Sequence, residues 1–436
     1  MVMLPTFSQG KLGHTAEGRG LRALALLAVM VLACSVSLPG CTIGPRALQD
    51  ARLKYNEVVK ATTEQQLLLN IVRLRYADTP SSLSVENIAA QFELLKSLQI
   101  TPFFIASGAE PNRSFTAILP QFGIQAADRP TISMVPIDDQ EFTRKLFTPL
   151  TLDGVIYLVR TTWPIGTVFR LYLENMNWVP NAEFASGPTP RNPPPYGDFL
   201  RGVFALQDLQ QQGRMVIHTE ERVEVLSDPL PTAQMSATTV VEAAKNGYEW
   251  RRLDGSGGWT LVRKKQQPVL FLDPRALDSA EVREFVRIFR LKPGLSKYDV
   301  TVDAVAPFAA RGGFTDGLEV VDLETRSLLQ AMYFVSHGVD VPPEHLGRRM
   351  TRVTADADGN PFDWSRVTEG LFKVYWSHGH SPPPNAHVAV LYHDYWFYID
   401  EADFDTKSTF SLLLELSRLS LQEKGTAPIF TLPLGR

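Results

Sequence analysis

Four histidines near the C-terminal end of the sequence are the residues whose type is best suited to binding a metal ion. His378 and His380 lie two positions apart, and His387 and His393 follow. Imidazole nitrogens are common ligands of zinc and other transition metals. However, three consecutive prolines separate His380 from His387, and no common ligand spacing is reproduced. We therefore predict no metal and no cofactor, and we keep His378, His380 and His387 as candidate ligands to be checked.

Two other short motifs resemble parts of functional sites but lack essential members. Asp356-Ala357-Asp358-Gly359-Asn360 has the start of a calcium-binding loop, yet the twelfth position is Val367, where such loops carry glutamate. Ser256 lies between two predicted strands, whereas the nucleophilic serine of a hydrolase elbow lies between a strand and a helix. A turn explains both motifs more simply. We therefore predict no catalytic residue.

The densest aromatic run in the sequence is Tyr392 to Tyr398. In a strand, alternate residues face opposite sides, so Trp396 and Tyr398 share one face while Tyr395 and Phe397 share the other. We expect one of these faces to be core. The other face either lies under the helix that follows or binds a partner, or a glycan strand, by stacking.

Composition indicates a globular protein and argues against nucleic acid as a partner. The sequence has 436 residues, of which 44% are hydrophobic and 21% charged, a length that suggests two or three domains. It carries 43 basic and 47 acidic side chains, and residues 1–40 contain three of the basic ones and one of the acidic ones. Without those residues the net charge is −6, whereas binding to phosphates requires a basic face.

The N-terminal segment has the features of a bacterial lipoprotein signal peptide. Basic residues precede an apolar stretch at 23–37, and small Gly40 comes directly before Cys41. Leu38-Pro39-Gly40-Cys41 resembles a lipobox, although Pro39 departs from the usual residue. The resemblance implies cleavage after residue 40 and lipid attachment, palmitate included, to Cys41, which would anchor the chain to a membrane. Attachment at Cys34 and an uncleaved anchor are the alternatives.

The residue after the proposed lipidation site bears on where the protein is delivered. In Gram-negative lipoproteins an aspartate at this position favours retention in the inner membrane, and here it is Thr42. The resemblance therefore implies an outer-membrane lipoprotein that faces the periplasm. Delivery to the inner membrane and exposure on the cell surface stay open.

Three stretches of the body resemble an uncharacterised family of conserved-hypothetical lipoproteins from Gram-negative bacteria. They are Leu67–Pro80, Arg326–Pro342 and Tyr395–Leu414. The resemblance supports a location in the cell envelope. It implies no activity and no site residue beyond Cys41.

Periodicity and turn signals predict an α+β fold in which a helical and mixed N-terminal region precedes compact α+β subdomains with antiparallel hairpins. Six prolines in residues 180–197 predict an extended linker. The predicted organisation is a signal peptide (1–40), a helix-rich mixed region (41–179), the linker (180–197), and two α+β subdomains (198–290 and 291–436). The predicted helices are 45–76, 85–98, 138–146, 152–160, 167–176, 199–212, 237–246, 279–290, 324–335 and 408–421. The predicted hairpins are 215–218 with 222–226, 248–253 with 259–263, and 388–392 with 396–399, and a last strand is predicted at 428–432.

These observations favour a membrane-anchored envelope lipoprotein with a structural or protein-interaction role. Envelope proteins are then its expected partners, together with the membrane that holds the lipid on Cys41. The alternative is a hydrolase that acts on an envelope polymer through an active site that no motif reveals.

Overall fold

The computed structural model describes residues 43–81, 83–89, 92–105, 115–128, 131–136, 144, 146–161, 163–252, 258–302 and 317–421. Internal contacts divide the chain into two compact units, residues 1–60 with 88–132 and residues 61–87 with 133–436. Cys34, Cys41, Ser256 and the predicted strand 428–432 lie outside the described residues. Among the helices within these ranges, none has the length and apolar character needed to cross a membrane.

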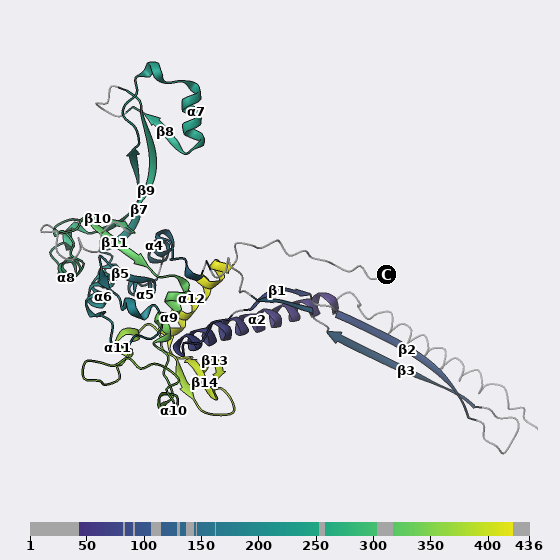
Figure 1. Cartoon of the computed structure of the whole chain (residues 1–436). Helices are drawn as coiled ribbons and strands as arrows, with labels where there is room; N and C mark the ends of the chain where they lie inside the picture. The colour runs from purple at the N-terminus through teal and green to yellow at the C-terminus, as the bar shows by residue number, and fades with distance from the viewer. Residues whose placement is uncertain are drawn as a thin grey trace, which may run out of the picture. The chain divides into compact units, whose positions relative to one another are not determined.

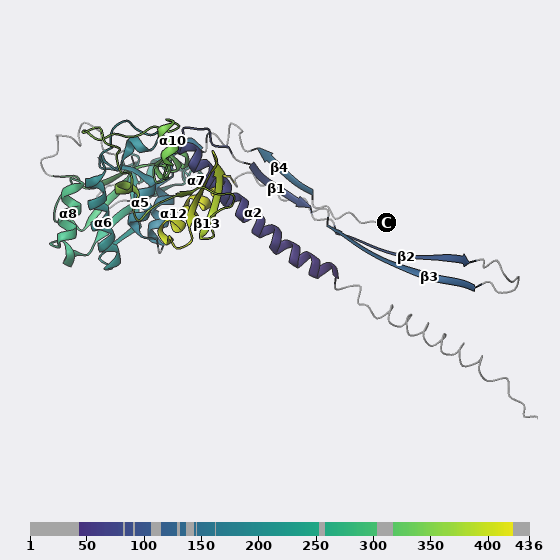
Figure 2. The same ribbon diagram turned by 90° about the horizontal axis from the view of Figure 1, so that it is seen from below.

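The first unit contains the start of helix α2 (Ile43–Arg75) and a long hairpin of β2 (Phe92–Ile105) and β3 (Phe115–Asp128). The two strands pair antiparallel along their whole length. The predicted helix 85–98 is therefore wrong. Apolar residues at 92, 94, 98 and 100 fit the two-residue period of a strand as well as a helical one, and pairing with β3 settles the conformation. β1 (Leu83–Ala89) and β4 (Thr131–Pro136) form a separate two-stranded sheet (Figure 2).

A seven-stranded sheet is the main element of the second unit (Figure 1). Its order is β6-β5-β11-β10-β9-β7, with β8 also paired to β9, and only β10 and β11 are parallel. The strands are β5 (Leu173–Met176), β6 (Val179–Pro180), β7 (Met215–Val225), β8 (Tyr248–Arg251), β9 (Thr260–Leu272), β10 (Lys297–Thr301) and β11 (Val320–Thr325). On β10, Tyr298 and Val300 are buried while Lys297, Asp299 and Thr301 are not, so one face of the sheet belongs to the core.

Helices contribute most of the large side chains in that core. Phe169, Phe199, Phe285 and Phe334 are each 2% exposed or less, and they come from α5, α6, α8 and α9. The helices of this unit are α4 (Leu152–Arg160), α5 (Ile165–Tyr172), α6 (Gly197–Gln211), α7 (Ala237–Lys245), α8 (Ala280–Ile288), α9 (Leu328–Ser336), α10 (Pro343–Gly347), α11 (Ser365–Thr368) and α12 (Phe404–Leu421). Short 3-10 turns lie at Glu183–Ala185, Thr232–Gln234 and Pro274–Ala276.

A second, three-stranded sheet lies in the C-terminal part of this unit. Its order is β12-β14-β13, and both pairings are antiparallel. The strands are β12 (Tyr375–Ser377), β13 (Ala386–Tyr392) and β14 (Tyr395–Asp400). Apolar residues of the last part of α2, from Leu67 to Leu74, and Tyr76 just after the helix are buried in the same core cluster as residues of β13, β14 and α12.

The proline-rich stretch 180–197 lies inside the second unit and packs against it. Asn181 and Ala182 have no exposed surface. Arg326, which is also fully buried, donates from Nη2 to the carbonyl of Asn181 and from Nε to Ser186 Oγ. Its Nη1 donates to the carbonyl of Arg170, near the end of α5. A guanidinium at the C-terminal carbonyls of a helix is favourable, so Arg326 joins this stretch to the sheet and helices.

The α+β class predicted from the sequence is confirmed, and most elements lie where they were predicted. Three of the second unit's predicted elements are wrong in part. The predicted hairpin 215–226 is one uninterrupted strand, β7, because β9 pairs with it from Met215 to Val225. The predicted helix 167–176 becomes strand β5 at Leu173, and the predicted helix 324–335 begins only at Leu328, after a Ser327 capping box.

Candidate binding groove

The aromatic hairpin β13–β14 has the alternation predicted from its sequence. Tyr395 and Phe397 are buried, whereas Trp396 and Tyr398 are partly exposed. His393 and Asp394 form the two-residue turn, and both have positive φ angles, 46° and 68°. Turns of this kind match the natural twist of a hairpin and hold its register. The buried face of the hairpin is therefore core.

Register determines which backbone groups of β13 point away from β14. The two-residue turn makes Tyr392 and Tyr395 a hydrogen-bonded pair, so Leu391 opposite Trp396 and Ala389 opposite Tyr398 are non-hydrogen-bonded pairs. The N–H and C=O groups of Ala389 and Leu391 therefore point outward. Within the described part of the chain, one hydrogen bond reaches these outward groups: Gln65 Nε2 donates to the Ala389 carbonyl at 3.4 Å. β13 thus presents an open strand edge.

A groove runs along this edge, and the second half of α2 forms its other wall. Its volume is about 470 Å³, within the usual range for ligand sites. The lining residues are Gln65, Gln66, Leu69, Arg73, Ser81, Ala389, Val390, Leu391 and Trp396. Leu391 is 55% exposed, and Arg73 is the charged residue of the lining. We refer to this feature as the α2–β13 groove.

Aromatic and polar contacts at one end of the groove fix its two walls to each other. Tyr76, just after α2, forms a 2.6 Å hydrogen bond with His345 Nδ1 and packs edge-on against Tyr392 and Phe397. Burial raises the pKa of Tyr76 and lowers the pKa of His345, so the hydrogen bond joins a neutral phenol to a neutral imidazole. Tyr392 Oη also donates to Asp78 at 3.1 Å. The groove is therefore preformed.

The candidate metal ligands have other partners or no common centre. His387 Nδ1 lies 2.9 Å from Glu401, which also accepts a hydrogen bond from Lys407. The contact with Lys407, and after it the contact with His387, lowers the pKa of Glu401. The ring of His378 packs 5.2 Å from that of Tyr395, and His380 is exposed. Over the described ranges, no group of three or more His, Cys, Asp or Glu residues is placed to hold a metal ion.

The segment that resembles the start of a calcium loop is a closed turn. Asp356 Oδ1 accepts hydrogen bonds from the backbone N–H groups of Asp358 and Asn360, at 3.0 and 2.8 Å. Gly359 has φ of 85°, and Ala355 pairs with Pro361 across the turn. The predicted turn is confirmed. An aspartate that satisfies its own loop's N–H groups is the usual Asx arrangement.

A second feature is the extension of β7 and β9 beyond the rest of the sheet. β10 pairs with β9 only at residues 269–271, so the earlier residues of β9 pair with β7 and β8 alone. Figure 1 shows α7 and β8 at the far end of these two strands. We call residues 219–268 the arm. Val225, Val240 and Val241 on the arm are 46–55% exposed.

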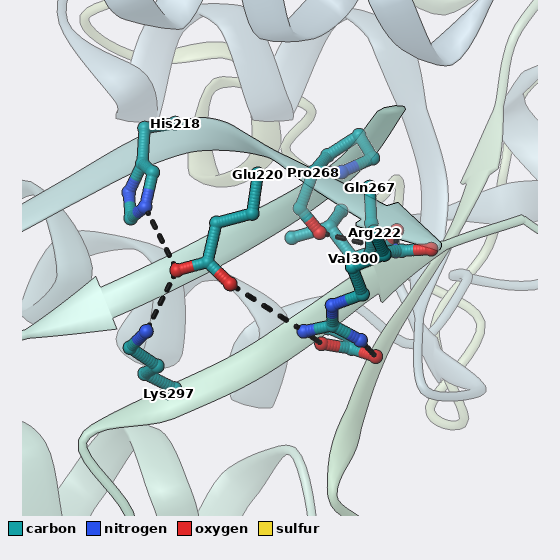
Figure 3. Close-up of polar contacts among 8 residues, drawn as sticks. His218, Glu220, Arg222, Gln267, Pro268, Lys297 and Val300 are labelled. Atoms are coloured by element: carbon teal, nitrogen blue, oxygen red, sulfur yellow. Dashed lines mark hydrogen bonds and ion pairs between the residues drawn. The ribbon is translucent and has the colours of Figure 1, made fainter. Parts of the chain in front are cut away.

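Ion pairs join the root of the arm to β10 (Figure 3). Arg222 on β7 forms a two-point contact with Asp299 on β10, at 2.5 and 2.6 Å. Glu220 accepts a hydrogen bond from Lys297 at 2.7 Å and lies 3.2 Å from His218 Nε2. The contact with Lys297, and after it the contact with His218, lowers the pKa of Glu220. These pairs bridge over β9, which lies between the two strands. Pairing with β9 along its whole length keeps β7 extended where the sequence predicts a turn.

No protein-family model, no curated protein and no solved structure matches the chain.

Sequence reasoning did not find the α2–β13 groove. Its lining comes from residues 65–81 and 389–396, which are remote in sequence and were assigned to separate elements. One signal was available: Leu391 is an apolar residue on a strand for which the sequence predicts only one partner strand, 396–399, so its other edge is left without a predicted cover.

Proposed function

We propose that this protein is an envelope lipoprotein, anchored through a lipid on Cys41, that binds another protein of the envelope. The single observation that carries the interaction role is the α2–β13 groove. Exposed strand edges with apolar neighbours are usually shortened, charged or covered, because they recruit other chains. An open edge beside a preformed groove therefore favours recognition of a partner polypeptide.

The anchor is tested by substituting the two leader cysteines separately. We expect Cys41→Ser to abolish labelling by a palmitate analogue and to leave the precursor unprocessed, because the acylated residue and the cleavage site are both lost. Cys34→Ser is the matched control and should be labelled and processed normally. Labelling that persists in Cys41→Ser and disappears in Cys34→Ser would move the anchor to Cys34.

The interaction role is tested by purifying the lipidated protein after cross-linking in intact cells. We expect a defined envelope protein to co-purify in stoichiometric amount and to be recovered by the reciprocal purification. A protein that is recovered alone and monomeric under these conditions would contradict the proposal. Separation of inner and outer membranes on a density gradient tests delivery to the outer membrane.

A further inference from the structure

We propose that the α2–β13 groove binds an extended segment of a partner protein as a fourth strand on β13, and that this segment carries an acidic side chain that pairs with Arg73. The inference rests on the proposed interaction role and specifies how the partner is recognised. Three features of the described residues carry it: the outward backbone groups of β13, the charge of the lining, and the rigidity of the walls.

The backbone of β13 offers the hydrogen-bonding pattern that a further strand requires. Ala389 and Leu391 point their N–H and C=O groups into the groove, two residues apart, which is the spacing at which an added antiparallel strand forms its pairs. Gln65 Nε2 at 3.4 Å from the Ala389 carbonyl acts as a weak substitute for the N–H of such a strand. Gln65 is an exposed residue, so its side chain can turn away when a stronger donor arrives.

The charge of the groove favours an acidic occupant. Arg73 is only partly exposed, and its Nη1 donates to the side-chain oxygen of Asn70 at 3.3 Å. Within the described ranges, no carboxylate pairs with Arg73, and none belongs to the lining. A half-buried guanidinium gains most from a carboxylate that accepts from two of its N–H groups. The bound segment should therefore present aspartate or glutamate at that end of the groove.

The apolar part of the lining sets the remaining chemistry of the segment. Leu69 on α2, Leu391 on β13 and Trp396 on β14 all line the groove. Successive side chains of a strand point to opposite sides, so alternate residues of the segment meet this apolar lining. Recognition of this kind takes affinity from main-chain hydrogen bonds and specificity from alternate side chains. We therefore expect a short segment with alternating apolar residues and one acidic residue.

The walls of the groove need no rearrangement to accept such a segment. The Tyr76–His345 hydrogen bond and the packing of Tyr76 on Phe397 tie α2 to the hairpin. Binding to a preformed site avoids the entropy loss of ordering the receptor. This is why a short segment suffices.

The experiment selects linear nine-residue peptides displayed on phage against the full-length protein in detergent and measures hydrogen exchange with the best peptide bound. We expect selected peptides to share alternating apolar residues and one Asp or Glu. The amides of Ala389 and Leu391 should exchange at least about tenfold more slowly in the complex, because they become paired. Protection confined to other strands would overturn the proposal, whatever the peptide sequence.

Matched substitutions separate the backbone from the side chains. Leu391→Pro removes an outward N–H, which an edge strand tolerates, and should weaken peptide binding by about tenfold. Leu391→Ala keeps that N–H and should weaken binding by only about threefold. Arg73→Gln should cost about fivefold and remove most of the salt dependence of binding, whereas Arg52→Gln, an exposed arginine on the same helix, should leave binding unchanged. Equal effects of Leu391→Pro and Leu391→Ala would refute strand addition.

The outcomes also distinguish this inference from the proposed function. If cross-linking in cells captures an envelope partner that the Leu391→Pro protein binds equally well, the groove is not the site and the interaction role still stands. If Leu391→Pro disturbs the hairpin itself, the exchange of Ala389 and Leu391 in the wild-type complex decides the question without that variant.

Discussion

Lowering the pH should destabilise the protein through one buried histidine, His337. The side chain is 3% exposed, its ring stacks on that of Trp364 at 4.1 Å, and its Nε2 lies 3.1 Å from the carbonyl of Ala185. Nε2 therefore carries the proton and donates it to that carbonyl. Nδ1 has no hydrogen-bond partner among the described residues. A second proton would add an unpaired charge inside the core.

Burial lowers the pKa of His337 from 6.5 to about 3, and the nearby guanidinium of Arg75 acts in the same direction. In the unfolded chain the same group titrates near 6.5. Between these values the unfolded state binds a proton that the folded state does not, so the free energy of unfolding falls as the pH falls from about 6.5 to about 3. Integrating that difference from pH 7 to pH 4 gives a loss of about 3 kcal/mol.

The assay compares urea unfolding of the wild type and of His337→Gln at pH 7 and pH 4. Glutamine is close in size, can donate to the Ala185 carbonyl and does not titrate. We expect the wild type to lose about 3 kcal/mol more than the variant over this interval. Taking the difference removes the contribution of carboxylates, which are common to both proteins. A difference below about 1 kcal/mol would refute the reasoning.

Two further substitutions test the packing of the second unit. Arg326→Met should lower the free energy of unfolding in urea by about 3–5 kcal/mol, because it leaves several buried carbonyls without their donor. A loss no larger than that caused by Arg201→Met, at an exposed arginine, would contradict this. Gly202→Ala should cost about 1–3 kcal/mol, because its Cβ would lie 2.4 Å from the ring of Phe289. Gly187→Ala, which meets no atom within 4 Å, is the control, and thermal melting of both glycine variants decides the point.

Local signals in the sequence predicted those elements whose structure is decided locally. The helix at 152–160 has Thr151 as its N-cap, and the structure confirms both its ends. The hairpin around His393 and Asp394 was predicted from alternation and a two-residue turn. In each case the residues that determine the element lie within it or directly beside it in the sequence.

Prediction from the sequence failed for features whose structure depends on contacts with residues far away in the sequence. Thr219-Glu220-Glu221 has the composition of a turn, yet these residues pair with β9 and continue the strand. The α2–β13 groove depends on which edge of a small sheet is left open, and no local pattern encodes that. The buried role of Arg326 was equally hidden, since arginine is a surface residue by default.

The register of the arm gives the protein a natural point of excision. Val225 on β7 lies directly opposite Val262 on β9, and just beyond this pair the N–H of Leu226 donates to the carbonyl of Leu261 at 2.8 Å. A two-residue turn can close a hydrogen-bonded pair of this kind, so residues 227–260 could be replaced by Asn-Gly while the ion pairs of Arg222 and Glu220 stay in place. Homologous insertions or deletions are tolerated at such junctions. The far end of the arm is thus a separable module, whose gain or loss in evolution or by design would leave the α2–β13 groove as it is.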